Sequence, residues 1–272
     1  MRLFVANVGV NSNDARKRGL RSPVLPDGSF EFVPIKESST FRAAANVPFY
    51  RELPSWTGRW SSLGEVVPER ALRYRVHNDP DFLGLTYGEI ERSRASALAR
   101  VQPGDQLWFL ARLWDHDGER FTGGNCFYFV GRFEVELNLR LEPLKPDVDQ
   151  SILSRLEGNA HWKRWLAGDR EPFRVLVGAP LKSARFRHPV QVTAEVARLL
   201  FAAEAYDDAR DRFARGGVDL LNLNGRPRTM RHFHSITRTI QAYLDTNRDW
   251  QQPYVQALHD LAMRAGAAVP PP

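Results

Sequence analysis

Two long runs of alternating side chains, joined by one short loop, constrain the fold of this chain more than any other feature. The runs are GDQLWFLARLW at residues 104–114 and CFYFVGRFEVELNL at residues 126–139, with DHDGERFTGGN between them. Alternation with a period of two is typical of strands, and Asp and Gly in the connection favour a hairpin. We therefore predict an antiparallel hairpin within a strand-rich core.

Several shorter segments add to this core. The start, MRLFVANVGV, is apolar on both faces and indicates a central strand rather than a signal peptide. Asp27-Gly28 predicts a turn between two extended runs, and FRVLVGAP predicts another strand. A short helix is expected around Trp162 and Trp165. Residues 38–67 have no clean period and predict a long irregular excursion, which is where ligand-binding loops often lie.

A helix is predicted at residues 86–101. Thr86 and Glu89 have the spacing of a capping box, with Leu85 and Ile90 placed as a hydrophobic staple. Apolar residues then recur at helical spacing until Pro103 and Gly104 end the pattern.

The character of the sequence changes near residue 190. Apolar residues recur at helical spacing in residues 192–213 and 229–244, which predicts helices there. The predicted fold class is therefore α+β, with a mixed or antiparallel barrel-like core at residues 1–189 and a helical annex at 190–265. Residues 266–272, which include three prolines, are expected to fray.

Composition narrows the class of protein. The net charge of +6 favours an anionic partner, nucleic acid first, although a basic chain can also carry such charge for no binding purpose. The single cysteine, Cys126, excludes an internal disulfide and a thiolate zinc cluster, and we expect it to be buried in a protein of the reducing cytoplasm. No apolar run approaches the roughly 18 residues of a membrane helix, so no membrane association is predicted.

The segment HNDPDF at residues 77–82 is the main candidate site. His77, Asp79 and Asp81 could offer imidazole and carboxylate ligands to a metal, but their spacing matches neither a zinc signature nor an EF-hand. We therefore predict no metal and no cofactor. A plain turn before the next element remains the first interpretation, and a polar ligand site the second. If the protein is an enzyme, His77 and Asp79 are its candidate acid–base groups.

Other polar clusters have weaker signals. Asp115-His116-Asp117-Gly118 is expected to form the hairpin turn, and His232 and His234 are two residues apart, so they would diverge on a helix. Nucleophile-elbow, phosphate-loop and zinc-protease motifs are absent from the sequence. Four arginines between residues 226 and 238 form either a phosphate-contacting patch or an ordinary solvated helix face.

The order of these segments resembles a known family. SPVLPDG with Ser22 and Asp27, then His77-x-Asp79-Pro80, then Gly104-Asp105 before an aromatic hairpin, is similar to the nucleotide-modification-associated domain family of the third type. The similarity is clearest over residues 1–140, and the opening VANVGVN departs from it. The Gly-Asp turn and following strand also resemble the PUA-like barrels of the pseudouridine-synthase and archaeosine-transglycosylase group.

The resemblance implies a role beside nucleic-acid base modification in prokaryotes or their viruses. We predict first a module that recognises a modified or extruded base or nucleotide. The alternatives are an enzyme acting on such a base and a protein-interaction scaffold built on residues 190–262. The oligomeric state stays open. The predicted ligand-binding residues are Ser22, His77, Asn78, Asp79, Asp81, Asp105, Trp108, Trp114 and Asn125, and the predicted phosphate-binding residues are Arg21, Arg226, Arg228, Arg231 and Arg238.

Overall fold

The computed structural model describes residues 3–41, 46–91, 98–141, 148–169 and 171–192, and then residues 206–207, 212–213, 218–221, 227–230, 239–240 and 252–267. A mixed eight-stranded sheet dominates this part of the chain. Its strand order is β14-β1-β6-β7-β8-β5, with β2 also paired to β6 and β9 to β7.

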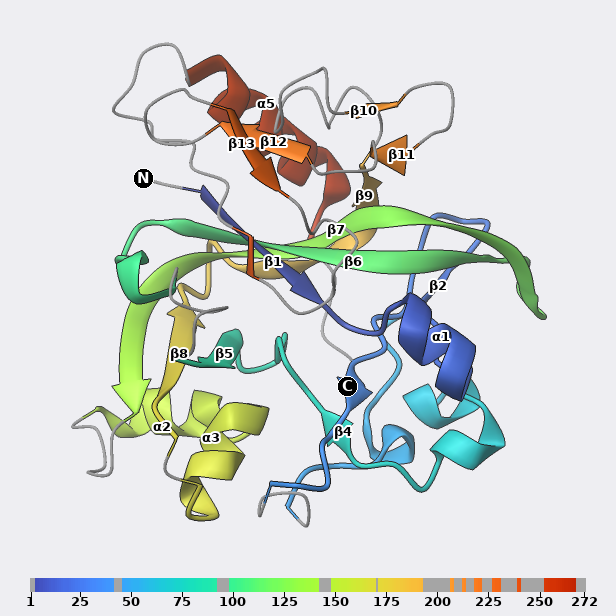
Figure 1. Cartoon of the computed structure of the whole chain (residues 1–272), viewed down its shortest axis with the longest axis horizontal. Coiled ribbons are helices and arrows are strands. Elements are labelled where there is room, and N and C mark those ends of the chain that lie inside the picture. The colour runs from blue at the N-terminus through green and yellow to red at the C-terminus, as the bar shows by residue number, and fades with distance from the viewer. Residues whose placement is uncertain are drawn as a thin grey trace.

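The predicted hairpin is confirmed as the centre of the sheet. Strand β6 (Gln106–His116) pairs antiparallel with β7 (Phe121–Leu141), and Leu107 lies opposite Phe133. Strand β7 is long enough to pair first with β6 and β9 (Ala184–Gln191) and then with β8 (Phe173–Gly178). In Figure 1 the β6–β7 ribbon crosses the middle of the molecule, with α5 on one side and α1, α2 and α3 on the other.

The N-terminal strand and the first turn are also confirmed. Strand β1 (Leu3–Val8) runs parallel to β6, and β14 (Thr239–Ile240) covers its other edge. Helix α1 (Ser12–Arg18) follows, capped by the side chain of Asn11. Strand β2 (Pro23–Val24) leads into the turn, where Gly28 has φ 79° and donates its N–H to the Leu25 carbonyl. A positive φ is a conformation that glycine adopts without steric cost.

The described residues of the excursion, 38–41 and 46–67, are irregular, as predicted. Short 3₁₀ helices at Tyr50–Glu52 and Leu63–Glu65, and a third at Glu69–Ala71, fold against a buried cluster that includes Trp114. The excursion is bracketed by β3 (Ile35–Lys36) and β4 (Val76–His77), which pair antiparallel. This pairing brings residue 37 beside residue 77, although the two are forty positions apart.

The helix predicted at residues 86–101 is wrong over its first turn. Thr86–Ile90 form β5, an edge strand paired antiparallel with β8, and Leu98–Arg100 form a 3₁₀ turn. Residues 92–97 lie outside the described residues. Tyr87 enters the main core, and the Thr86 hydroxyl accepts a hydrogen bond from Asn159, so tertiary pairing overrides the local capping pattern.

Two helices after the hairpin cover β8. Helices α2 (Gln150–Leu156) and α3 (Ala160–Leu166) pack with Phe173, Val175 and Val177 in one buried cluster. The predicted helix at Trp162 and Trp165 is thereby confirmed, and their rings stack with centroids 5.1 Å apart. The strand predicted at FRVLVGAP is β8.

The predicted barrel is wrong, and the helical C-terminal third is not confirmed. The sheet is open, because β14 and β5 at its two ends do not pair with each other in the described part of the chain. From residue 193 onward, the described residues of the two predicted helices form short strands, namely β10 (Tyr206–Asp207), β11 (Arg212–Phe213), β13 (Pro227–Met230) and β14, and β12 (Val218–Leu221) pairs with β13. The other residues of this part of the two helices lie outside the described residues. Backbone pairing, including the covering of the β1 edge, outweighs the helical spacing of apolar residues at these positions.

The end of the described chain is helical. Helix α5 (Gln252–Ala265) lies beside β9, and Ala267 forms a bridge with Phe186, so residues 266–267 of the expected frayed tail are ordered. The division at residues 189–190 stays a prediction, although β9 runs through it. Cys126 is half-buried in β7 rather than fully buried. Among the described residues, no helix combines the length and apolar character needed to cross a membrane.

Candidate functional site

The segment HNDPDF divides its side chains between two environments. His77 and Asp79 are buried, each about 7% exposed, and point into a cluster of polar side chains. Asn78 is half-exposed and lines two hollows on the surface, together with Asp81. The segment is therefore a turn and a candidate site at once, because His77 and Asp79 enter the cluster while Asn78 reaches the surface and Asp81, 3% exposed, holds the turn by accepting the Leu83 N–H.

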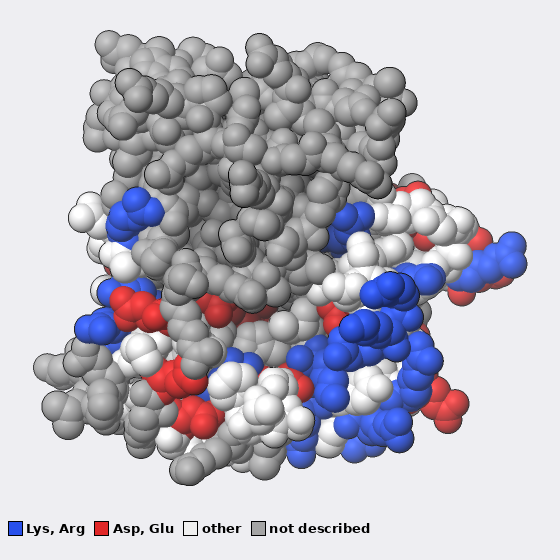
Figure 2. Space-filling model, viewed as in Figure 1, with Lys and Arg blue, Asp and Glu red and all other residues white. Residues whose placement is uncertain are grey.

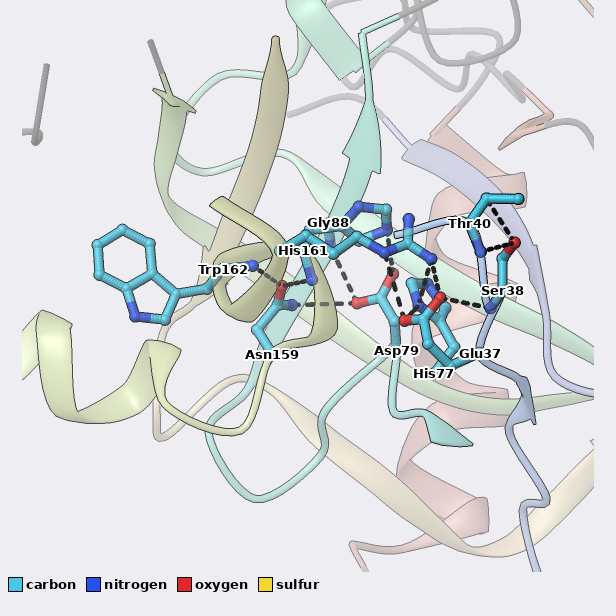
Figure 3. Close-up of polar contacts among 10 residues, drawn as sticks. Glu37, Ser38, Thr40, His77, Asp79, Gly88, Asn159, His161 and Trp162 are labelled. Atoms are coloured by element: carbon cyan, nitrogen blue, oxygen red, sulfur yellow. Dashed lines mark hydrogen bonds and ion pairs between the residues drawn. The ribbon is translucent and has the colours of Figure 1, made fainter. Parts of the chain in front are cut away.

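His77 is held by a buried ion pair. Its Nδ1 lies 3.0 Å from Oε2 of Glu37, and the Arg164 guanidinium contacts both oxygens of the same carboxylate. The Glu37 side chain has no exposed surface, and Arg164 is covered by the ring of Phe41, 3.7 Å from the guanidinium carbon. Figure 3 shows Glu37 and His77 meeting Asp79 from one side of the cluster.

Asp79 connects this ion pair to helix α3. Its Oδ1 accepts hydrogen bonds from the Gly88 N–H at 2.9 Å and from the Asn159 amide at 3.1 Å. Its Oδ2 faces His161, at 3.6 Å from Nε2. In Figure 3, Asn159 reaches Asp79 from the side opposite Glu37, and the ring of His161 approaches the same carboxylate from above.

The start of α3 fixes the position of His161. Asn159 is the N-cap, and its side-chain oxygen accepts from the N–H groups of His161 and Trp162. Gly88 allows β5 to approach the helix, since a Cβ at this position would lie 2.8 Å from the His161 Cβ. We call these six side chains the His–Asp cluster: Glu37, His77, Asp79, Asn159, His161 and Arg164.

Burial and ion pairing shift the pKa values of Glu37 and Asp79 in opposite directions. Burial alone would raise the pKa of Glu37, but its hydrogen bond to His77 and the attraction of His77 and Arg164 outweigh burial and lower that pKa to about 2. Burial raises the pKa of Asp79 well above its ordinary value, against the opposing hydrogen bond from Gly88. Burial also lowers the pKa of His161 well below its ordinary value, assisted by His77 and Arg164. Such perturbed groups in one place are characteristic of functional sites.

A groove lies beside the cluster. Its volume is about 490 Å³, and the turn at residues 78–84 forms one wall while α2 and α3 form another. Apolar and polar groups share its lining, as in most ligand sites. Lys163 projects into the groove, and partial burial lowers its pKa while Asp81 and Glu157 oppose that effect. The groove is lined by Pro48, Glu52, Leu53, Pro54, Asn78, Asp81, Leu83, Gly84, Ser154, Arg155, Glu157, Gly158 and Lys163.

Three of the cluster residues could hold a metal ion. His77, Asp79 and His161 each offer a ligand atom, and these atoms all lie within 4.8 Å of one another. The third member, His161, is 82 positions beyond Asp79 in the sequence, so the spacing of HNDPDF alone gave no indication of it.

The predicted tryptophans lie in the core. Trp108 has no exposed surface, and its ring meets Phe129 and Phe186 edge-on. Trp114 is 5% exposed and belongs to the cluster beneath the irregular excursion. Neither indole presents a free face, so base stacking on them would require them to leave the core.

The other predicted ligand residues have local structural partners. Ser22 is buried and accepts the Val33 N–H, Asp105 accepts the N–H of Gln102, and Asn125 is exposed near the hairpin end, where it accepts from Arg112. Arg21 is half-buried over the ring of Phe121. None of these contacts joins the His–Asp cluster. The side chain of Arg228 and all of Arg226, Arg231 and Arg238 lie outside the described residues.

A basic surface lies on the face formed by α1 and the neighbouring 3₁₀ segments. Arg16, Lys17, Arg70 and Arg73 are exposed there, and Arg70 donates to the carbonyl of Arg18, which brings the two segments together. Figure 2 shows Lys and Arg side chains gathered on this face. We refer to these four residues as the basic surface.

Comparison with known proteins gives one match. A family model described as nucleotide modification associated domain 3 matches residues 2–256. The match extends well beyond residues 1–140, where the sequence resemblance is clearest. No curated protein and no solved structure matches the chain.

Proposed function

This chain belongs to the nucleotide modification associated domain 3 family, and from that premise we propose that the groove and the His–Asp cluster bind a nucleotide or a nucleic-acid base and act on it chemically. The groove would hold the ligand, and His77 and Asp79 would be the reacting or metal-holding groups at its edge.

One observation carries the proposal: two histidines, two carboxyl groups and a guanidinium are buried together beside a groove of ligand size. Burying an ion pair is a poor way to stabilise a fold, because the desolvation penalty offsets most of the attraction. Apolar side chains of similar volume would stabilise the same position at least as well. The retention of so many ionisable groups is therefore better explained by chemistry than by stability.

The groove has the mixed lining that a nucleotide needs. Leu53, Pro54 and Leu83 offer an apolar surface for the face of a base, while Asn78 and Asp81 offer donors and acceptors for its edge. Lys163 can meet a phosphate as a point charge. A volume of about 490 Å³ falls within the range of roughly 300–1,000 Å³ that is usual for small-ligand sites.

The basic surface favours a nucleic acid over a free nucleotide. Phosphate contacts by Lys and Arg provide most of the sequence-independent affinity of nucleic-acid-binding proteins. Such contacts position the polymer, whereas contacts to base edges select the base. We assign these two tasks to the basic surface and to the groove, respectively.

The groove is tested with Lys163→Met and the matched control Lys182→Met, whose lysine is exposed and paired with Glu134 elsewhere on the surface. Fluorescence anisotropy with short labelled single-stranded and double-stranded oligonucleotides, in low salt, measures affinity. We expect Lys163→Met to weaken binding about tenfold, the loss of one charge-assisted hydrogen bond, and the control to bind as wild type. Equal affinities for the two variants would place the ligand elsewhere.

Turnover is tested separately by incubating bound oligonucleotides with the protein and analysing their nucleosides by mass spectrometry. A changed nucleoside mass that disappears in His77→Gln supports an enzyme. Binding without any change, across candidate metals and small-molecule co-substrates, would leave recognition as the function and contradict the catalytic part of the proposal.

A further inference from the structure

The meeting of His77, Asp79 and His161 goes beyond a generic acid–base site. All three are buried, and one ligand atom of each lies within 4.8 Å of the others. We propose that these three side chains bind one divalent transition-metal ion. Its part in base chemistry rests on the proposed function, but the binding itself does not.

The donor set selects the class of ion. Two imidazoles and one carboxylate suit the divalent first-row transition metals, whereas Mg²⁺ and Ca²⁺ prefer sites made wholly of oxygen. Atoms bound to one such ion at about 2.0–2.2 Å in a tetrahedral site lie about 3.4 Å apart. The observed separation of up to 4.8 Å therefore requires the side chains to approach one another by about 1 Å when an ion binds.

The surroundings orient His77 as a ligand. Nδ1 of His77 lies 3.0 Å from Oε2 of Glu37 and 3.2 Å from a guanidinium nitrogen of Arg164, so the described polar contacts of the ring are made through Nδ1. The tautomer that donates from Nδ1 to Glu37 has its lone pair on Nε2, where it can bind a metal ion. In metal sites, a carboxylate that accepts the N–H of the ring nitrogen not bound to the metal commonly fixes the tautomer and orientation of the histidine. Arg164 shares the same Glu37 carboxylate, so its positive charge is already paired.

Asp79 and His161 also keep atoms that can bind a metal ion. Both described hydrogen bonds to the Asp79 side chain use Oδ1, so Oδ2 is directed toward His161. The Nδ1 atom of His161 is buried and has no hydrogen-bond partner in the described part of the chain. The Nε2 atom of the same ring lies 3.6 Å from Asp79 Oδ2, so Nε2 is the nitrogen that is placed to share an ion with that carboxylate. The imidazole itself is nearly sealed, at 2% exposed.

Three protein ligands would leave positions for water or substrate. Structural metal sites usually have four protein ligands, whereas catalytic sites keep an open position. His77 and Asp79 each keep a small exposed fraction, and the groove lined by the neighbouring residue Asn78 lies next to them along the chain.

The test uses the full chain, stripped with a chelator, and no nucleotide. Titration calorimetry with Mn²⁺, Co²⁺, Ni²⁺ and Zn²⁺, and with Fe²⁺ without oxygen, measures affinity and stoichiometry. We expect one ion per chain and a higher melting temperature. Because replacing even an outer-layer partner costs about 10–100-fold in affinity, His161→Gln should weaken binding at least about 100-fold. His188→Gln, which alters an exposed histidine, should bind as wild type.

Several results would overturn the inference. These are no stoichiometric binding of any of the five ions, or binding that survives unchanged in both His161→Gln and Asp79→Asn. If either variant fails to fold in the presence of chelator, X-ray absorption of the wild-type Co²⁺ complex decides: two imidazole ligands support the site, and none or one overturns it. A bound ion with no nucleotide affinity would leave this inference intact and contradict the proposed function alone.

Discussion

The ion pair between Glu37 and Arg164 gives a quantitative test of the architecture that holds the His–Asp cluster together. Glu37 has no exposed side-chain surface and Arg164 retains 7%, so neither charge can be solvated if the other is removed. Glu37 also accepts the Ser38 N–H at 2.6 Å and pairs with His77. We therefore expect Glu37→Gln and Arg164→Met each to destabilise the protein strongly.

The magnitude follows from two independent routes. The pKa of Glu37 falls from its ordinary value of 4.5 to about 2, although burial opposes the fall, which corresponds to about 3 kcal/mol in favour of the charged folded form. Breaking a buried pair by removing one partner typically costs about 3–5 kcal/mol. Both estimates give a loss of about 3 kcal/mol for Glu37→Gln at pH 7. For Arg164→Met only the second estimate applies, because His77 contributes more than Arg164 to lowering the pKa of Glu37.

The double variant separates pairing from simple loss of packing. Glu37→Gln with Arg164→Met removes both charges of the pair but also the Glu37 contact with His77, so it should cost less than the sum of the singles by about 2 kcal/mol. Urea unfolding at pH 7, followed by circular dichroism, measures all four proteins. The matched control is Glu134–Lys182, a 2.6 Å pair whose lysine is 63% exposed, and its cycle should give below about 1 kcal/mol.

The pH dependence has a definite sign. A folded pKa below the unfolded value means that the Glu37 contribution is present at pH 7 and is lost as pH falls from about 4.5 to about 2. The difference in unfolding free energy between wild type and Glu37→Gln should therefore shrink over that range. Additive single effects, within about 0.5 kcal/mol, together with a difference that is constant with pH, would refute the reasoning.

Three further outcomes follow from the same structure. Gly88→Ala places a methyl group 2.8 Å from both Cβ and Cδ2 of His161, so it should lower stability by about 1–3 kcal/mol in urea unfolding, and adding His161→Ala, which removes the ring contact but not the Cβ contact, should recover part of that loss. Trp108→Ala should cost about 3–5 kcal/mol as a core cavity, while the folded protein binds oligonucleotides as wild type; a selective loss of binding would restore the stacking role. Arg16→Gln, Lys17→Gln and Arg73→Gln combined should weaken oligonucleotide binding and flatten its salt dependence by about one unit of slope per lost phosphate contact, whereas an unchanged slope would remove the basic surface from the interface.

The parts of the fold that sequence predicted are those whose signal is long and regular. Alternation across residues 104–139 predicted the β6–β7 hairpin because both of its strands bury side chains at fixed intervals. The prediction at Thr86 failed because a capping pattern covers only four residues, and pairing with β8 provides five residues of backbone hydrogen bonding. A short capping pattern does not produce a helix where the same residues can instead pair with the edge of a sheet.

The candidate site was half predictable for a related reason. His77, Asn78, Asp79 and Asp81 stand together in the sequence, so their density was visible. Glu37, Asn159, His161 and Arg164 reach them only through the β3–β4 pairing and the packing of α3 on β5, which local patterns do not encode. Of these four residues, Asn159 carried a sequence signal for its position. An asparagine before AHWKRWL is a suitable N-cap and predicts His161 in the first turn of a helix.

Burial along HNDPDF explains how one turn can serve two tasks. His77 and Asp79 belong to the sealed cluster, where a low effective dielectric strengthens electrostatic interactions with any bound ion. Asn78 is half-exposed and lines the groove, where hydrogen bonding to a ligand competes with water, whereas Asp81 also lines it but is only 3% exposed. Because one turn of five residues holds both sets of side chains, a ligand bound by Asn78 lies close to the cluster. Variants of Asn78 should therefore change ligand affinity alone, whereas variants of His77 should change turnover and metal binding at unchanged ligand affinity. If variants of either residue lose ligand affinity, turnover and metal binding together, the turn is one site rather than two.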